Sequence, residues 1–355
     1  MPGPIRGILT PNLTPVDDRG RVDEQTLRGY VDWLIDNGVD GLYPNGSTGE
    51  FVRFTAQERR EIVRIVIDQT AGRVPVLAGA AEANVRETID AANAYGEMGA
   101  TAVAIVAPFY YRLSSDGVSE YFRSIATEVE IDVTLYNIPL FASPIDVDTV
   151  VRLASECPRI VGIKDSSGDL PNMMRMIAAI RPMRPDFTFL TGWDASLAAM
   201  LIVGADGGTN ATSGVVPELT RAIHRAVQNG DHATAIELQH QLIPLFDRMI
   251  GMGEFPEGFR AGARSRGWDL GPGRVPLSDA QQASVASQQR QIDHLVREQT
   301  AAVQRSVGNA SADTTDRAVN PSRESGDQSK PHDIEAIQRV IQRVIGELSI
   351  RNESN

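Results

Sequence analysis

Short apolar stretches rich in β-branched residues alternate with longer amphipathic stretches along the first 230 residues. The amphipathic stretches run for about 10 to 15 residues, with apolar side chains at three- and four-residue spacing. This alternation is typical of repeated βα units, and eight units can be counted. The strands are predicted at residues 5–9, 41–44, 74–78, 102–106, 133–136, 160–164, 188–191 and 206–209.

Helix-start signals lie between several of these strands. Asp23 precedes the apolar positions that begin at Leu27, and Thr55 is followed three residues later by Glu58. An Asp or Thr side chain at the first helix boundary accepts a backbone hydrogen bond, and a glutamate three residues on completes a capping box. Both segments are therefore predicted to be helices.

Eight parallel βα units of this length close naturally into a (β/α)8 TIM barrel, which we predict for residues 1–230. A doubly wound sheet is the alternative architecture. Such sheets commonly carry a glycine-rich phosphate-binding turn after the first strand. Residues 10–15 of this chain read Thr-Pro-Asn-Leu-Thr-Pro instead, which favours the barrel.

The C-terminal third has three predicted parts. Residues 231–304 read as helices that pack on the outside of the barrel, and residues 305–331 read as a disordered linker because they carry almost no large apolar side chains. Residues 332–355 hold an amphipathic helical tail. Its apolar face is formed by Ile334, Ile337, Val340, Ile341, Val344, Ile345 and Leu348.

Two interpretations of this tail stay open. It can be a packing or oligomerisation helix. A short amphipathic helix after a linker also resembles the encapsulation peptides that bring enzymes into bacterial microcompartments, in which case a groove of a partner protein would bind its apolar face.

Composition narrows the choice of function. The net charge of −12 opposes binding to nucleic acid or to anionic membranes, and no apolar run approaches the roughly 20 residues that cross a bilayer. The N-terminus lacks the apolar segment of a signal peptide, so we expect a cytoplasmic enzyme. Cys157, the single cysteine, is expected to be buried, and the first 223 residues contain no histidine, which disfavours His-based triads and metal sites there.

Lysine usage singles out one position. The chain has 32 arginines and two lysines, Lys164 and Lys330. Lys164 ends the sixth predicted strand, and barrel enzymes place their active sites at this end of the strands. A lysine amine can form an imine with a ketone, whereas an arginine guanidinium stays protonated and cannot. A surface lysine is the ordinary alternative, but the rarity and placement of Lys164 favour catalysis.

Tyr136 ends the fifth predicted strand, next to the strand of Lys164. Its phenol can therefore lie within hydrogen-bond reach of the amine or of a substrate, which makes it a candidate proton shuttle. A packing role at the strand end is the alternative.

A turn rich in glycine and hydroxyl groups follows the second predicted strand. Backbone N–H groups around Gly46 and the hydroxyls of Ser47 and Thr48 suit a bound carboxylate. Glycine-rich turns after strands are common, so a plain tight turn is the alternative.

Three motifs together resemble the dihydrodipicolinate synthase/N-acetylneuraminate lyase superfamily. They are Gly-Ser-Thr-Gly-Glu at 46–50, Tyr-Asn-Ile-Pro at 136–139 and Gly-Ile-Lys-Asp at 162–165, and their order and spacing match over roughly residues 4–300. The resemblance implies a class I aldolase on a TIM barrel that needs no metal or organic cofactor.

The resemblance also implies residue roles. Lys164 would form an imine with pyruvate or another 2-oxo acid, Ser47 and Thr48 would hold the carboxylate, and Tyr136 would transfer protons. Thr48 would connect Tyr136 to Tyr110 of a neighbouring subunit, so a dimer or a tetramer built from dimers is expected.

Two departures bear on the substrate. The lysine-biosynthetic synthases of this superfamily have a run similar to Tyr-Asn-Val-Pro-Ser-Arg, whose arginine binds the carboxylate of the aldehyde. This chain reads Tyr-Asn-Ile-Pro-Leu-Phe at 136–141, so Phe141 stands in place of that arginine. Sialic acid lyases have a run similar to Gly-Tyr-Asp-Glu on the seventh strand, whose acidic pair binds the sugar hydroxyls. This chain has Gly-Trp-Asp-Ala at 192–195, so only Asp194 of that pair is present and Ala195 replaces the glutamate.

An aldolase for a 2-keto-3-deoxy sugar acid fits these departures best, with Asp194 and Ser166 as candidate ligands of substrate hydroxyls and Gly192 and Phe141 as further pocket residues. The alternatives are a dehydratase for the same acids, a condensing 4-hydroxy-tetrahydrodipicolinate synthase, an N-acetylneuraminate lyase, and a non-enzymatic 2-oxo-acid-binding protein.

Overall fold

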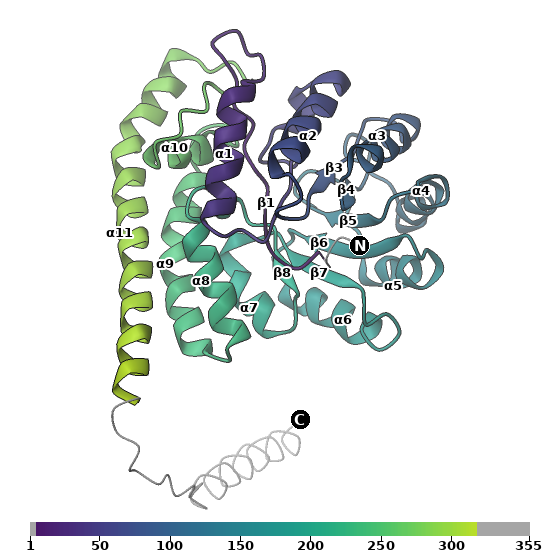
Figure 1. The fold of residues 1–355 in the computed structure, drawn as a ribbon. Helices are drawn as coiled ribbons and strands as arrows, with labels where there is room; N and C mark the ends of the chain where they lie inside the picture. The colour runs from purple at the N-terminus through teal and green to yellow at the C-terminus, as the bar shows by residue number, and fades with distance from the viewer. Residues whose placement is uncertain (1–4, 318–355) are drawn as a thin grey trace, which may run out of the picture. The chain divides into compact units, whose positions relative to one another are not determined.

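All eight predicted strands are present in the computed structural model, which describes the backbone of residues 5–317 and the side chains of residues 5–303 apart from residue 302. The strands are parallel and follow the order β2-β1-β8-β7-β6-β5-β4-β3. A parallel bridge between Leu42 and Val76 joins the ends of this order, so the sheet closes and the predicted TIM barrel is confirmed (Figure 1). The strands are β1 (Gly7–Thr10), β2 (Gly41–Leu42), β3 (Leu77–Gly79), β4 (Ala102–Val106), β5 (Val133–Asn137), β6 (Ile160–Asp165), β7 (Thr188–Thr191) and β8 (Gly207–Gly208).

A helix follows each strand and covers the outside of the barrel (Figure 1). These helices are α1 (Glu24–Asp36), α2 (Ala56–Thr70), α3 (Val85–Met98), α4 (Ser115–Glu128), α5 (Val147–Glu156), α6 (Leu170–Ile180), α7 (Leu197–Ile202) and α8 (Pro217–Gln228). Short 3₁₀ helices are η1 (Phe51–Arg53), η2 (Asp194–Ser196) and η3 (Ala211–Gly214). Within residues 5–317, no helix combines the length and apolar character needed to cross a bilayer.

The predicted helix starts are confirmed. The Asp23 side chain accepts a hydrogen bond from the backbone N–H of Thr26, which begins α1. At α2 the Thr55 hydroxyl accepts from the Glu58 N–H, and the Glu58 carboxylate accepts from the Thr55 N–H. Each cap satisfies backbone donors that lack a partner inside the helix, which fixes where the chain leaves a loop.

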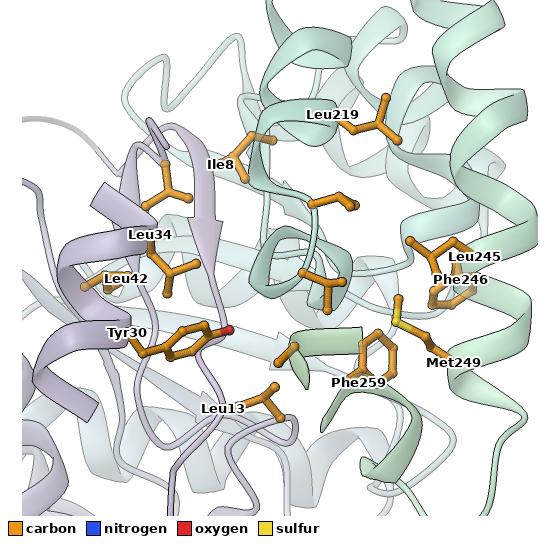
Figure 2. Close-up of a cluster of buried hydrophobic side chains, with 14 of the residues drawn as sticks. Ile8, Leu13, Tyr30, Leu34, Leu42, Leu219, Leu245, Phe246, Met249 and Phe259 are labelled. Atoms are coloured by element: carbon orange, nitrogen blue, oxygen red, sulfur yellow. The ribbon is translucent and has the colours of Figure 1, made fainter. Parts of the chain in front are cut away.

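Three more helices follow the barrel: α9 (His232–Ile250), α10 (Glu257–Ser265) and α11 (Asp279–Arg317). Within the compact unit that ends at Arg305, apolar side chains from α9 and α10 enter one cluster with those of α1 and α8. Figure 2 shows Tyr30 of α1, Phe246 of α9 and Phe259 of α10 in this cluster. The C-terminal helices are therefore part of the hydrophobic core and reach back to the start of the barrel.

The linker prediction is wrong for residues 305–317, because α11 continues as a helix to Arg317. The composition of these residues shows that they can bury little surface, but extending an existing helix avoids the cost of starting one. The rest of the predicted linker and the predicted tail at 332–355 lie outside the described residues.

The inside of the barrel is filled by a separate apolar cluster, which comes from the strands and the residues that flank them. Its members are Ile5, Leu9, Tyr43, Leu77, Ala102, Ala104 and Leu190. Side chains in a strand alternate between the two faces of the sheet, so these residues form a floor below the C-terminal ends of the strands. Polar side chains collect above this floor.

Candidate active site

Lys164 lies near the C-terminal end of β6, in register with Tyr136 on β5 and Leu190 on β7. Its side chain is only 3% exposed. The amine nitrogen Nζ lies 4.0 Å from the ring centroid of Tyr136 and 4.7 Å from that of Tyr43. The faces of aromatic rings attract a cation. Two tyrosines thus hold the amine at a defined place inside the mouth of the barrel.

Asp165, the next residue along β6, points to the opposite side of the strand. Its carboxylate accepts hydrogen bonds from the Asn137 side chain (2.9 Å) and from the backbone N–H (3.0 Å) and hydroxyl (2.9 Å) of Ser167. Burial raises the pKa of Asp165 above its ordinary value, although these hydrogen bonds work in the other direction. Asp165 therefore shapes the loop after β6, away from the Lys164 amine.

The phenol of Tyr136 contacts a hydroxyl of the predicted carboxylate-binding turn. Its oxygen lies 3.3 Å from Oγ of Ser47. Among the described side chains, Ser47 makes this contact with the Tyr136 phenol. Thr48 is buried in the lining of the same cavity but does not make it. The turn and the two strands β5 and β6 therefore bring Lys164, Tyr136 and Ser47 together, as the sequence predicted.

An ion pair at the back of the turn fixes its shape. Glu50 has a φ of 59° and Asn45 a φ of 56°, both in the left-handed region. The Glu50 carboxylate accepts hydrogen bonds from Arg260 of α10, with Nε at 3.1 Å, and from Arg53 at 2.6 Å. Burial raises the pKa of Glu50, but the two arginines outweigh it, so the pKa lies below its ordinary value.

Gly192, directly after β7, leaves the space that Lys164 occupies. A Cβ atom at this position would lie 2.6 Å from Cε of Lys164 and closer still to Oγ of Ser166. Such contacts are below the separation of packed atoms, so any larger residue would displace the lysine or the serine. Gly192 lines the cavity through its backbone, as the sequence predicted.

Two hydroxyl groups in the cavity have no hydrogen-bond partner among the described residues. They belong to Ser166, which the sequence singled out, and to Thr209, which it did not. Both residues are buried. A buried hydroxyl without a partner is costly, so these two groups suit a polar atom of a bound ligand.

Asp194 lines the cavity, but its carboxylate is engaged by the chain itself. Its oxygens accept hydrogen bonds from the backbone N–H (2.7 Å) and hydroxyl (2.6 Å) of Thr212 and from the N–H of Ala211 (3.3 Å). Burial raises the pKa of Asp194, and these hydrogen bonds together with the charge of Lys164 oppose the rise. Asp194 thus holds the turn after β8 in place. The sequence predicts a different role for it, as a ligand of substrate hydroxyls.

Phe141 stands at the mouth of the cavity and is 49% exposed. Its ring lies 6.2 Å from that of Phe255, which in turn lies 5.8 Å from Phe259, as measured between centroids. Phe246 and Trp193 form another aromatic pair in the lining, 5.3 Å apart. The outer part of the cavity is therefore aromatic.

The sequence model of the dihydrodipicolinate synthetase family matches residues 4–295 of this chain. The chain belongs to this family. The match spans the barrel and the helices α9 and α10, including every residue of the cavity.

Curated members of the family share about a third of their residues with this chain. The 4-hydroxy-tetrahydrodipicolinate synthase of Bartonella bacilliformis is 33% identical over 77% of this chain and 92% of its own length. That of Bradyrhizobium diazoefficiens is 37% identical over 69% and 82%. A DapA-like lyase of Halobacterium salinarum is 34% identical over 77% and 88%.

Solved structures of the family have the same fold. YagE, a prophage protein from E. coli K12 solved in complex with pyruvate, is 29% identical with a TM-score of 0.74, over 81% of this chain and 98% of YagE. The 4-hydroxy-tetrahydrodipicolinate synthase of Methylacidiphilum fumariolicum is 28% identical with a TM-score of 0.77, over 85% and 99%. This family member is thus an enzyme of the carbon–carbon lyase and synthase class.

Tyr110 lies apart from the cavity of its own chain. It is 85% exposed on the loop after β4, and its ring packs edge-on against Tyr111 at 4.9 Å between centroids. Its predicted place in a neighbouring subunit's site stays a prediction.

Sequence reasoning missed the residues that come from α9, α10 and the loop between them. Phe246, Phe255 and Phe259 line the cavity although they follow Lys164 by more than eighty residues. Phe246 and Phe259 belong also to the core cluster in Figure 2. Their apolar pattern predicts helix packing, and nothing in it distinguishes a wall of the site from the core.

Proposed function

We propose that this enzyme is a class I aldolase that forms an imine between Lys164 and pyruvate or a related 2-oxo acid. The observation that carries the proposal is the buried amine of Lys164, which lies between two tyrosine rings at the inner end of a cavity. An amine that is buried and yet reaches a cavity can attack a bound ketone while bulk water is excluded.

In this proposal the amine attacks the keto carbon and water leaves, which gives a protonated imine. Loss of a proton from the adjacent carbon produces an enamine, whose carbon attacks an aldehyde. The aldehyde oxygen then takes up a proton, and water hydrolyses the imine to release the product and the amine. The same steps in reverse cleave a 4-hydroxy-2-oxo acid into pyruvate and an aldehyde.

The polar residues take their roles from their positions. The hydroxyls of Ser47 and Thr48 and the N–H groups of the turn around Gly46 hold the carboxylate, because the turn lies beside Lys164 at the cavity. Tyr136 moves protons between the substrate and Ser47, whose Oγ lies 3.3 Å from its phenol oxygen.

Ser166 and Thr209 support substrates of the 2-keto-3-deoxy acid type. Every aldol product carries a hydroxyl on the carbon that came from the aldehyde, and the two unpartnered hydroxyls can hold this oxygen as it gains charge. A 2-keto-3-deoxy sugar acid has further hydroxyls beyond this one. Condensation of the 4-hydroxy-tetrahydrodipicolinate synthase type is the second candidate, favoured by the names of the curated relatives.

We also propose that two copies of the chain share their active sites through Tyr110. The exposed pair of Tyr110 and Tyr111 supports a protein contact, because large aromatic side chains are costly to leave in water. Light scattering should give a dimer or tetramer, and Tyr110→Ala should weaken both assembly and activity. A fully active monomer would contradict this arrangement.

Borohydride reduction in the presence of pyruvate tests the imine directly. The reduced adduct should appear on the peptide that contains Lys164, and Lys330, the other lysine of the chain, is an internal control for non-specific modification. Lys164→Arg keeps a positive charge and should give no adduct. Equal labelling of both lysines, or none at Lys164, would refute the proposal.

A further inference from the structure

The cavity changes character between its two ends. At the inner end lie Lys164 and the hydroxyls of Ser47, Ser166 and Thr209. The rest of the lining, from the interior out to the mouth, consists mainly of aromatic and aliphatic side chains. The principal ones are Leu140, Phe141, Phe246, Ile250, Phe255 and Phe259.

Three phenylalanines form a continuous path from solvent to the interior. Phe141 is half exposed, Phe255 is partly buried, and Phe259 is fully buried, with neighbouring ring centroids 6.2 and 5.8 Å apart. Leu140 beside them is 69% exposed. Large apolar side chains that stay exposed at the mouth of a cavity are typical of a surface that binds an apolar group.

Within the part of the chain that the structure describes, the cavity lining carries charge at two residues, Lys164 and Asp194. The carboxylate of Asp194 is already hydrogen-bonded to Ala211 and Thr212, and Lys164 is consumed by the imine. Among the described residues no lining cation is left for the carboxylate of a second substrate. Arg53 lines the adjoining pocket, which shares Phe141 and Phe255, but its guanidinium is paired with Glu50 at 2.6 Å. The aromatic walls likewise offer no partners for a row of hydroxyls, and a polar group that loses water without gaining a partner weakens binding.

We infer that the aldehyde handled by this enzyme is apolar, an aromatic or alkyl aldehyde whose side chain lies between Phe141, Phe255 and Phe246. This inference rests on the proposed aldol function and, within the 4-hydroxy-2-oxo acids, replaces the hydroxylated end of a sugar acid by an apolar end. The enamine carbon of the Lys164 adduct bonds to the aldehyde carbon, and the C=O electron pair moves to oxygen, which takes a proton near Ser166 and Thr209. Water then cleaves the imine.

A panel of aldehydes with pyruvate tests the inference. Benzaldehyde and butanal represent the apolar class, glyceraldehyde the hydroxylated class and glyoxylate the carboxylated class. Product formation is followed by chromatography and mass spectrometry. We expect kcat/KM for benzaldehyde or butanal to exceed that for glyceraldehyde and glyoxylate by at least about tenfold.

Phe141→Arg sharpens the test, with Met183→Arg as the matched control. Met183 has a similar exposure, 44% against 49%, and does not line the cavity. Phe141→Arg should raise KM for the apolar aldehyde by about tenfold or more and improve turnover of glyoxylate, because it adds a cation at the mouth. Met183→Arg should change neither value, and both variants should still form the pyruvate adduct at Lys164.

The outcomes separate the two claims. If the adduct forms but glyceraldehyde or glyoxylate is preferred, or neither apolar aldehyde reacts, the apolar substrate is refuted and the imine mechanism stands. If no adduct forms at Lys164, the proposed function fails and the inference fails with it. If Phe141→Arg changes the oligomeric state in light scattering and leaves KM unchanged, Phe141 belongs to a subunit contact and the inference is again refuted.

Discussion

The inner end of the cavity and its mouth differ in their chemistry and in their origin along the chain. Lys164, Tyr136 and Ser47 come from the C-terminal ends of neighbouring barrel strands or the turn after one. The mouth combines Phe141 from the loop after β5 with Phe255 from the loop between α9 and α10 and Phe259 from α10, and these two helices also form part of the core. The contrast suggests that residues at the strand ends determine the reaction, whereas the loops and helices around the mouth determine the substrate, so the two are separable by mutation.

The largest expected effect concerns the inner end. Lys164→Arg should reduce aldol activity by at least about 10⁴-fold, because the nucleophile that forms the covalent intermediate is lost. Steady-state kinetics and circular dichroism together check that the loss is chemical and not a failure to fold. A variant that keeps a tenth of the activity would show that the amine is dispensable.

Tyr136→Phe is the next test of the inner end and should lower kcat by about 10²- to 10³-fold, since it removes the proposed proton shuttle and keeps the ring beside the amine. Tyr43→Phe is the matched control, because Tyr43 also faces the amine but lies outside the cavity lining. Burial and the nearby Tyr136 raise the pKa of Tyr43 well above its ordinary value, so it holds its proton. Equal losses in both variants would argue against a shuttle.

Gly192→Ala tests the cavity wall beside Lys164 and Ser166. The added Cβ would lie 2.6 Å from Cε of Lys164 and would displace the amine. Because the amine is then misplaced relative to the bound ketone, kcat should fall by about 10²-fold. Gly72→Ala serves as the comparison, because Gly72 has a φ of 73° but open space around it. That variant should lose about 1 kcal/mol of stability and no activity. An active Gly192→Ala enzyme would mean that the amine tolerates movement.

Glu50→Gln tests the support behind the turn at Ser47. A carboxyl whose pKa is depressed on folding stabilises the protein above its unfolded pKa, and this contribution is lost as pH falls through the folded pKa. At neutral pH the free energy of unfolding of the variant should be lower by about 3–5 kcal/mol, because the buried guanidinium of Arg260 loses its charged partner.

The pH dependence of this loss gives the contradicting outcome. Denaturant unfolding of both proteins at several pH values should show the difference shrinking as pH falls below the ordinary range of glutamate. Carboxyls with raised pKa, such as Asp165 and Asp194, occur in both proteins and cancel. A difference that does not change with pH would exclude the ion pair as the source.

Much of the barrel and of its inner end could be predicted because the signals are local. Strand patterns, the caps at Asp23 and Thr55, and the motifs around Lys164 and Tyr136 each occupy a few adjacent residues. The mouth could not be predicted in this way. Phe255 joins Phe141 there from more than 110 positions further along the chain. The contact between Glu50 and Arg260, which supports the turn at Ser47, likewise spans 210 positions.

The role of Asp194 shows a second limit. The similarity of its sequence run to the Gly-Tyr-Asp-Glu run of sialic acid lyases predicts a ligand of substrate hydroxyls, and Asp194 does line the cavity. Its oxygens are nonetheless taken by Ala211 and Thr212, seventeen and eighteen residues further on. A motif predicts which side chain reaches a cavity. Which groups hydrogen-bond to its polar atoms depends on the folded chain.

Exchange of the methyl protons of pyruvate for deuterium tests the separation of the two ends most directly, because it requires the imine and enamine but no aldehyde. The methyl signal of pyruvate in D₂O, followed by proton NMR, should disappear at the same rate with the wild-type enzyme and with Phe141→Arg, and no faster with Lys164→Arg than without enzyme. A wild-type enzyme that does not promote exchange, or exchange that persists in Lys164→Arg, would contradict the assignment of the chemistry to Lys164.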